Sequence, residues 1–279
     1  MWTQTAITEK LGLRYPIIQA GMAGGSTTPQ LVAAVSNAGG LGQLGAGYMT
    51  PQAIREAIQE IRRLTDRPFA VNLFVNEIPE ANAAEVEKVQ GLMRKYREEL
   101  NLPEPAPLTK YGERYQEQLQ VILEERVALF SFTFGMPTAA EMEELRSAGI
   151  LTCGTATTVA EAVALEAHGV DLICGQGHEA GGHRGTFRLE AERSLVGTMA
   201  LIPQIVDAVK VPVIAAGGIM DGRGVAAALM LGAGAAQLGT AFLTVEESGA
   251  HAVYKKAILE STDDSTSLTQ AFSGRHARG

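Results

Sequence analysis

Two histidines, His178 and His183, lie in the glycine-rich stretch GQGHEAGGHRG, which runs from Gly175 to Gly185. The pKa of an imidazole lies near physiological pH, so either ring could transfer a proton. A zinc pair on a helix needs two histidines four residues apart, and this pair has a different spacing in a glycine-rich segment. A zinc site is therefore disfavoured. We expect His183 to be catalytic and His178 to be structural. Glu179 either orients a histidine or caps a turn.

Short apolar segments and helical patterns alternate along the chain, and they must position these residues. The apolar segments are nearly continuous, as in parallel strands covered on both faces. There are eight of them: Pro16–Ala20, Gly40–Leu44, Phe69–Phe74, Val127–Phe132, Ile150–Gly154, Val170–Cys174, Val211–Ala216 and Ala235–Gly239. The helical patterns are Pro29–Asn37, Pro51–Leu64, Ala139–Ala148, Val159–His168, Thr198–Ala208 and Gly222–Leu231. Eight such units predict an α/β fold, a single-domain (β/α)8 TIM barrel over residues 1–279; a doubly wound sheet is the alternative.

One segment interrupts this alternation. Asn76–Arg126 is charged and helical in pattern, and it contains the sequence LPEPAPL at Leu102–Leu108. It predicts a helical insertion after strand three, lying over one end of the barrel. Solvated helix faces explain its charges most simply, and a lid over the active site is the alternative.

Glycines and polar residues follow most of the predicted strands. In a TIM barrel the loops after the strands carry the active site, and the last two often bind phosphate through backbone N–H groups. Gly217 and Gly218 end strand seven, and Gly239 and Thr240 end strand eight. These positions predict a phosphorylated ligand or cofactor; tight turns are the alternative explanation.

Three amide side chains, Gln19, Asn72 and Gln176, lie on or just after buried strands. Such amides must be satisfied by neighbouring backbone or by a ligand. Asn72 and Gln176 together indicate a flat, hydrogen-bonding ligand such as an isoalloxazine ring. Met22, in the first loop, either fills space or covers one face of a flavin.

The composition excludes several classes of partner. The net charge of −8 argues against binding to nucleic acid or to an anionic membrane. Cys153 and Cys174 form neither a metal motif nor a disulfide framework, which favours a reducing compartment. The sequence shows no signal peptide and no membrane-spanning segment. We expect a cytoplasmic enzyme with a small-molecule partner; the sequence leaves open whether it is a monomer or a homo-oligomer.

Four stretches together closely resemble the nitronate monooxygenase family: PIIQAGMAGG, GQGHEAGGHRGTF, IPQIVDAVKVPVIAAGGIMDGRGVAAAL and QLGTAFL. The likeness extends from Pro16 to Gly279 and includes the ending AFSGRHARG. The Gly-Gly-His element is the more specific signal, since phosphate-binding barrels share the AAGGI-DGRG element more widely.

The resemblance implies a (β/α)8 barrel that binds FMN non-covalently. The positions that match the family's FMN contacts are Asn72, Gln176, Gly181, Gly218 and the run Gln237-Leu238-Gly239-Thr240. Their neighbours complete the expected cofactor site: Gln19, Ala20, Gly21, Met22, Gly182 and Gly217. His183 matches the catalytic histidine. The implied reaction is oxidation of alkyl nitronates, and in some members of nitroalkanes, by O2 to a carbonyl compound and nitrite.

Two other functions stay open beside this one. FMN-dependent enoyl-ACP reductases and quinone reductases, which use NAD(P)H, resemble the same family, and a flavin-binding barrel without turnover is the second alternative. A metal-dependent hydrolase is disfavoured because the ligand set is missing. Family members usually continue past the SGR-x-ARG stretch, so we expect a C-terminal family extension to be missing from this sequence.

Overall fold

Eight parallel strands form the centre of the molecule in a computed structural model that describes residues 1–76, 82–106, 110–188 and 190–279. The strands are β1 (Ile17–Gln19), β2 (Gly42–Gly45), β3 (Phe69–Phe74), β4 (Leu129–Thr133), β5 (Leu151–Ala156), β6 (Leu172–Gln176), β8 (Val213–Ala216) and β9 (Ala235–Leu238). Their order is β1-β9-β8-β6-β5-β4-β3-β2, and a parallel bridge between Ile18 and Leu41 joins the two ends. The sheet therefore closes, which confirms the predicted (β/α)8 barrel.

Apolar side chains fill the barrel and the layer between strands and helices. Inside the barrel, Ile18, Leu129 and Leu172 pack together with Cys153 and Cys174. Burial raises the pKa of Cys174 to about 12, and it also raises the pKa of Cys153. Both cysteines are free thiols and serve as core residues.

Helices follow most of the strands, and most of the helices begin after a residue whose side chain caps them. They are α1 (Ala6–Leu11), α2 (Pro29–Ala38), α3 (Pro51–Leu64), α4 (Ala83–Glu99), α5 (Tyr115–Glu125), α6 (Ala139–Ser147), α7 (Val159–Ala167), α8 (Thr198–Ala208), α9 (Gly222–Met230), α10 (Thr240–Leu243) and α11 (Ala252–Glu260). Thr28 illustrates the capping, because its hydroxyl accepts a hydrogen bond from Leu31 N while Pro29 occupies the first helical position. The caps of α2, α3, α6, α7 and α9 fix where the loops before these helices end.

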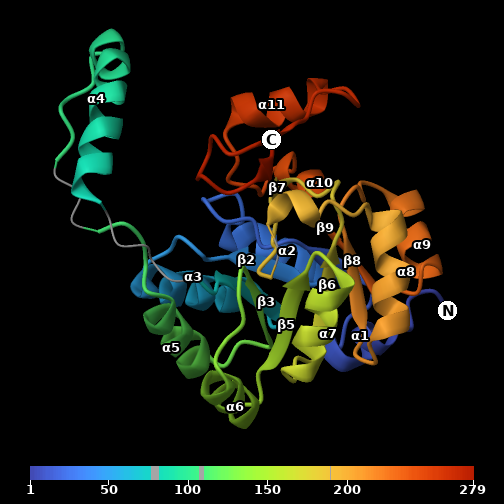
Figure 1. Cartoon of the computed structure of the whole chain (residues 1–279). Helices are drawn as coiled ribbons and strands as arrows, with labels where there is room; N and C mark the ends of the chain where they lie inside the picture. The colour runs from blue at the N-terminus through green and yellow to red at the C-terminus, as the bar shows by residue number, and fades with distance from the viewer. Residues whose placement is uncertain (77–81, 107–109, 189) are drawn as a thin grey trace.

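The segment Asn76–Arg126 contains two different helices. Helix α5 packs on the barrel through Leu119 and Ile122, both buried, and so covers β3. Helix α4 has no buried residue and projects away from the barrel (Figure 1). Residues 77–81 and 107–109, including the end of LPEPAPL, lie outside the described residues.

A second, smaller sheet lies beyond the carboxyl ends of the strands (Figure 1). It consists of β7 (Gly182–His183), β10 (Leu268–Thr269) and β11 (Ala277–Arg278), paired antiparallel in the order β10-β11-β7. We call residues 268–278 the C-terminal strap. The strap brings the end of the chain onto the loop that carries both candidate histidines.

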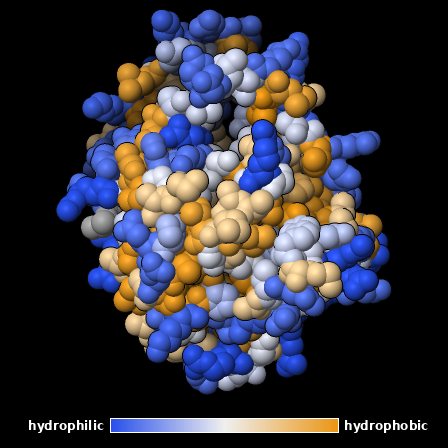
Figure 2. Space-filling model, turned by 90° about the vertical axis from the view of Figure 1, so that its right-hand side faces the viewer, coloured by the Kyte–Doolittle hydropathy of each residue, from blue (hydrophilic) through white to orange (hydrophobic). Residues whose placement is uncertain are grey.

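The face formed by α8 and α9 carries apolar side chains dispersed among hydrophilic ones (Figure 2). Met230, at the end of α9, is 87% exposed. None of the helices in the described ranges has the length and apolar character needed to cross a bilayer.

Candidate active site

His183 lies in β7, half-buried, where the loop after β6 passes over the barrel. Its Nε2 shares a hydrogen bond of 2.6 Å with Ser273 Oγ of the strap. Its ring meets the ring of Phe134 edge to face at 5.9 Å between centroids. Burial, and after it the charge of Arg275, lowers the pKa of His183 below 6.5. The imidazole is therefore neutral at neutral pH and able to accept a proton.

The strap is held on this loop by main-chain and side-chain contacts. Ala277 pairs with His183 and Arg278 pairs with Gly182 across β11 and β7. Arg184 N donates to the carbonyl of His276 at 2.9 Å. Composition and spacing gave no sign of this pairing, so Ser273 was missed as a neighbour of His183, although the SGRHARG stretch contributed to the family resemblance.

His178 has a different environment from His183. Arg278 donates to His178 Nε2 at 2.9 Å and to the carbonyl of the same residue at 3.3 Å. Burial, followed by the charges of Arg278 and Arg184, lowers the pKa of His178. A neutral ring that accepts from Arg278 anchors the strap, which agrees with the structural role expected for His178.

Glu179 caps a helix. Its carboxylate accepts hydrogen bonds from Thr198 N, at 2.8 and 3.1 Å, and from Thr198 Oγ1 at 2.8 Å. Thr198 begins α8, whose N-cap residue is Gly197, a residue without a side chain to cap the helix. Of the two roles left open by the sequence, these contacts match capping. Thr198 Oγ1 also lies 2.9 Å from the carbonyl oxygen of Gly217, so this residue lies between the loops that follow β6 and β8.

Gln176 uses both ends of its amide to shape the His183 loop. Nε2 donates to the carbonyl of His183 at 3.1 Å, and Oε1 accepts from Gly185 N at 2.8 Å. The buried Arg184 donates to the carbonyls of Gln176 at 2.6 Å and of Gly177 at 2.8 Å. Burial lowers the pKa of Arg184 to about 10, so this residue stays charged at neutral pH. Both ends of the Gln176 amide are therefore paired with the backbone of the loop, and Gln176 positions His183.

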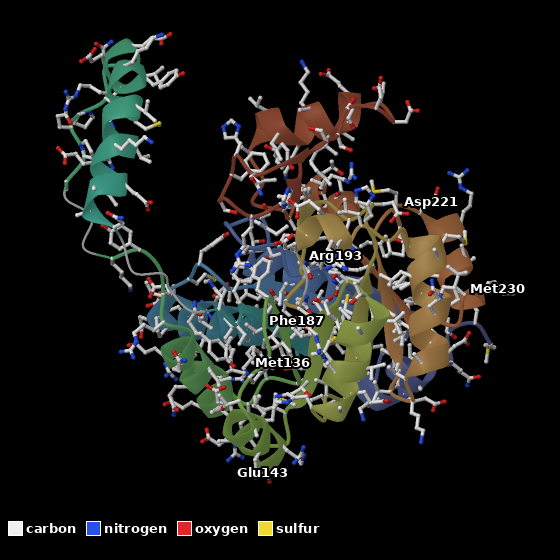
Figure 3. The ribbon with its side chains drawn as sticks, viewed as in Figure 1. Met136, Glu143, Phe187, Arg193, Asp221 and Met230 are labelled. Carbon is white, nitrogen blue, oxygen red and sulfur yellow. The ribbon has the colours of Figure 1, made fainter. Side chains whose placement is uncertain are left out.

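A buried carboxylate, Glu161, holds the segment that follows β7. It accepts from Thr157 N at 2.7 Å, Phe187 N at 2.7 Å and Arg188 N at 2.9 Å. Burial alone would raise the pKa of Glu161, but the hydrogen bonds outweigh it and the pKa is lowered. Phe187, which belongs to this segment, is labelled near the centre of Figure 3. The sequence pattern did not single out Glu161, because a glutamate in the first turn of a helix is common and gives no sign of burial.

Amides and glycines from the first three strands meet at one side of the barrel mouth. Asn72 is 6% exposed, and its amide nitrogen donates to Ser131 Oγ at 2.7 Å. Within the described ranges, Asn72 Oδ1 accepts no hydrogen bond. Gly21 is close by, since a Cβ there would lie 2.8 Å from Asn72 Cβ. Gln19, by contrast, is fully buried and pairs with the backbone of Gln43 at 3.0 and 3.1 Å, across the β1–β2 seam.

The last strand ends lie next to the first loop. Ala20 N donates to the carbonyl of Leu238 at 2.9 Å. A Cβ at Gly239 would lie 3.7 Å from Ala20 Cβ and 3.8 Å from Met22 Sδ. Gln237 is half-buried in β9, one residue before Leu238. The structure thus gathers the residues expected from strands one and eight.

A glycine cradle lies at the ends of β8 and β9. Gly217 and Gly218 have φ of 118° and 70°, in the left-handed region that favours glycine. A Cβ at Gly217 would lie 2.9 Å from Thr198 Oγ1, and one at Gly181 would lie 2.9 Å from Thr240 Oγ1. Gly182 has φ of 74° and extends the loop. Consecutive backbone N–H groups in such turns suit a phosphate. No three metal-ligating side chains are clustered among the described residues.

Comparison with known proteins places the chain in one family. A family model described as nitronate monooxygenase matches residues 4–279. A protein named "Probable nitronate monooxygenase" from Staphylococcus haemolyticus is 49% identical over 281 residues, covering 100% of this chain and 78% of its own length. A namesake from Staphylococcus aureus (strain JH9) is 47% identical over 280 residues, covering 100% and 79%.

Solved structures agree with this assignment. A nitroalkane oxidase from Streptomyces ansochromogenes superposes with a TM-score of 0.87 at 44% identity, covering 99% of this chain and 79% of that one. FabK from Thermotoga maritima superposes with a TM-score of 0.77 at 35% identity, covering 99% and 74%. The chain belongs to the nitronate monooxygenase family and is an oxidoreductase.

Proposed function

We propose that this enzyme binds FMN and oxidises alkyl nitronates with O2 to a carbonyl compound and nitrite, with His183 as catalytic base or positioning residue. The observation that carries the proposal is a neutral, half-buried His183 fixed by Ser273 at the mouth of the barrel. The nitroalkane oxidase relative supports the substrate class. The other partners are small: O2 and, as a second substrate, the neutral nitroalkane.

The residues at the strand ends fit FMN. The backbone of Gly181, Gly217, Gly218 and Thr240 would hold the phosphate, because backbone N–H groups in a left-handed glycine turn such as Gly217-Gly218 suit an anion. Asn72 Oδ1 would accept from the flavin ring, and Met22 would cover part of it. When bound, FMN supplies the electron transfer and O2 chemistry that side chains lack.

The protein's own residues act on the proton and on the substrate's position. Neutral His183 accepts the acidic α-proton of a nitroalkane, or orients a nitronate that has already lost it. Ser273 restricts the rotation of the His183 ring through the hydrogen bond to Nε2. Phe134 packs edge to face against the His183 ring and limits its movement on that side.

The cofactor is tested by the visible spectrum and the mass of the flavin released from the purified protein. Bands like those of free FMN, and the mass of FMN, are expected. A protein that stays colourless after incubation with excess FMN contradicts the proposal.

The role of His183 is tested by replacing it with alanine. We expect His183→Ala to lower nitrite formation from a nitronate by about 10²–10⁴-fold, the usual worth of acid–base catalysis. His168→Gln is the matched control, since His168 ends α7 and contacts the carbonyl of Pro137. If His183→Ala keeps an activity within a few-fold of the parent, His183 is not catalytic.

A second function is an NAD(P)H-dependent flavin reductase, favoured by the superposition on FabK at 35% identity. Anaerobic reduction separates the two. Bleaching of the flavin by a nitronate and not by NADH supports the oxidation of nitronates, and the reverse result supports the reductase.

A further inference from the structure

We propose that Arg275 of the strap is the anion-binding residue of the active site, and that its guanidinium binds the two oxygens of a nitronate or nitro group. This inference rests on the proposed function, because it concerns the substrate of the same site. It assigns a binding role to a residue that lies far from the barrel strands in sequence.

Arg275 is held beside His183 by its neighbours in the strap. Its Cζ lies 4.5 Å from the centroid of the Phe134 ring, and the same ring meets His183 at 5.9 Å. Ser273, two residues earlier, bonds His183 directly. Arg275 N in turn lies 3.4 Å from Ser273 Oγ, so the backbone of Arg275 is tied to the same hydroxyl.

The guanidinium of Arg275 differs from those of the other arginines around the loop. Arg184 donates to the carbonyls of Gln176 and Gly177, and Arg278 donates to His178 and Thr266. In the part of the chain that the structure describes, the Arg275 guanidinium has no carboxylate partner and donates no hydrogen bond. A planar fork of N–H donors is thus available to a ligand at the barrel mouth.

Phe134 provides a fixed platform for this guanidinium. It directly follows β4 and has φ of 73°, a left-handed conformation that is rare for a bulky residue. Such a conformation persists only when its surroundings hold it, and it is often found at functional sites. The Phe134 ring also packs on Phe74 at 5.0 Å. Stacking on a ring face leaves the edge of the guanidinium, which carries the N–H groups, free to bind.

The chemistry of the substrate matches this arrangement. A nitronate spreads one negative charge over two oxygens in a plane, as a carboxylate does, and arginine binds such groups through two parallel hydrogen bonds. Burial, and after it the positive charge of Arg275, lowers the pKa of His183 and keeps that ring neutral. Arg275 therefore favours an anionic substrate next to a neutral histidine.

The test compares Arg275→Gln with Arg275→Lys and with a control, Arg67→Gln, in the FMN-loaded enzyme at about pH 8, where His183 is neutral. Arg67 lies just before β3, at the opposite end of the barrel. Its replacement by glutamine removes the same positive charge as Arg275→Gln. Calorimetry with nitrite as the probe measures anion binding independently of turnover. We expect Arg275→Gln to weaken nitrite binding and to raise KM for a nitronate by about tenfold or more, because a charged hydrogen-bonding partner is lost.

The controls give each outcome a meaning. Arg275→Lys should recover part of the loss, Arg67→Gln should bind nitrite as the parent does, and KM for a neutral nitroalkane should rise less than KM for the nitronate. Unchanged nitrite binding in Arg275→Gln, a parent that binds no nitrite, or an equal rise in both KM values overturns the role of Arg275. A parent that binds nitrite through Arg275 but oxidises no nitronate contradicts the proposed function alone.

Discussion

Arg278 and His178 are a hundred residues apart in sequence and share a hydrogen bond of 2.9 Å between Nη2 and Nε2. Because an arginine only donates, the histidine nitrogen that faces it carries no proton. The pair attaches the strap to the loop after β6, and the same strap carries Ser273 and Arg275 to His183.

Removing this anchor should loosen the strap while the barrel stays folded. We expect Arg278→Leu to increase hydrogen exchange at the amides of Arg184 and of the β7–β11 pair. The free energy of unfolding should change by less than ~1 kcal/mol, because the strap opens locally. Exchange measured by mass spectrometry tests this, with Arg223→Leu as the exposed control. Identical protection in both variants would show that the contact does not hold the strap.

The pH dependence follows from the lowered pKa of His183. With a neutral nitroalkane, kcat/KM should fall as the pH decreases, with an apparent pKa below 6.5, because a protonated ring cannot accept the α-proton. Arg275→Gln removes a nearby positive charge, so the pKa of His183 should rise and the acidic limb should move to higher pH. A limb that stays in place would mean that Arg275 does not act on His183. The Arg67→Gln profile serves as the reference.

Gly217 should be sensitive to any side chain. Alanine there combines φ of 118° with a Cβ 2.9 Å from Thr198 Oγ1 and 3.1 Å from Ala180 N. We expect Gly217→Ala to weaken FMN binding by about tenfold or more, because backbone strain of about 1–3 kcal/mol would distort the glycine turn after β8. Gly222→Ala, where a Cβ meets nothing within 4 Å, is the matched control. Fluorescence titration with FMN gives both dissociation constants, and equal values would argue against the cradle.

Glu161 should contribute stability that depends on pH. Its pKa is lower in the folded state, so its contribution is present above the unfolded pKa and is lost as the pH falls through the folded value. At neutral pH we expect Glu161→Gln to lower the free energy of unfolding by about 2–3 kcal/mol, because backbone donors lose a charged acceptor. The control is Glu143→Gln, an exposed position on α6 (Figure 3). Urea unfolding at neutral and acidic pH measures this. The difference in free energy of unfolding between Glu161→Gln and the parent should be smaller at acidic pH.

Much of the barrel could be predicted from sequence because buried parallel strands are continuous in apolar character. All eight strands were predicted, although β6 ends at Gln176, two residues beyond the apolar segment that ended at Cys174. The polar end of that strand is stabilised by hydrogen bonds to the His183 loop, which hydropathy does not reveal. The capped helices α2 and α3 begin at Pro29 and Pro51, as predicted.

The rest of the site depended on contacts between distant segments. Nothing local indicates that Ser273 would reach His183, or that Arg184 would be buried among carbonyls. Gln19 shows the converse, since its amide could have faced a ligand but pairs with Gln43. Choosing between a ligand and a backbone partner for an amide requires the tertiary structure.

The position of the strap also orders events during synthesis of the chain. The barrel has all eight strands once Leu238 has been made, whereas the site waits for Arg278, 40 residues later. At the usual rate of translation that interval is roughly 2–8 s. Ser273 and Arg275 are therefore synthesised after every strand of the barrel, and they are among the last residues of the chain to reach the candidate site.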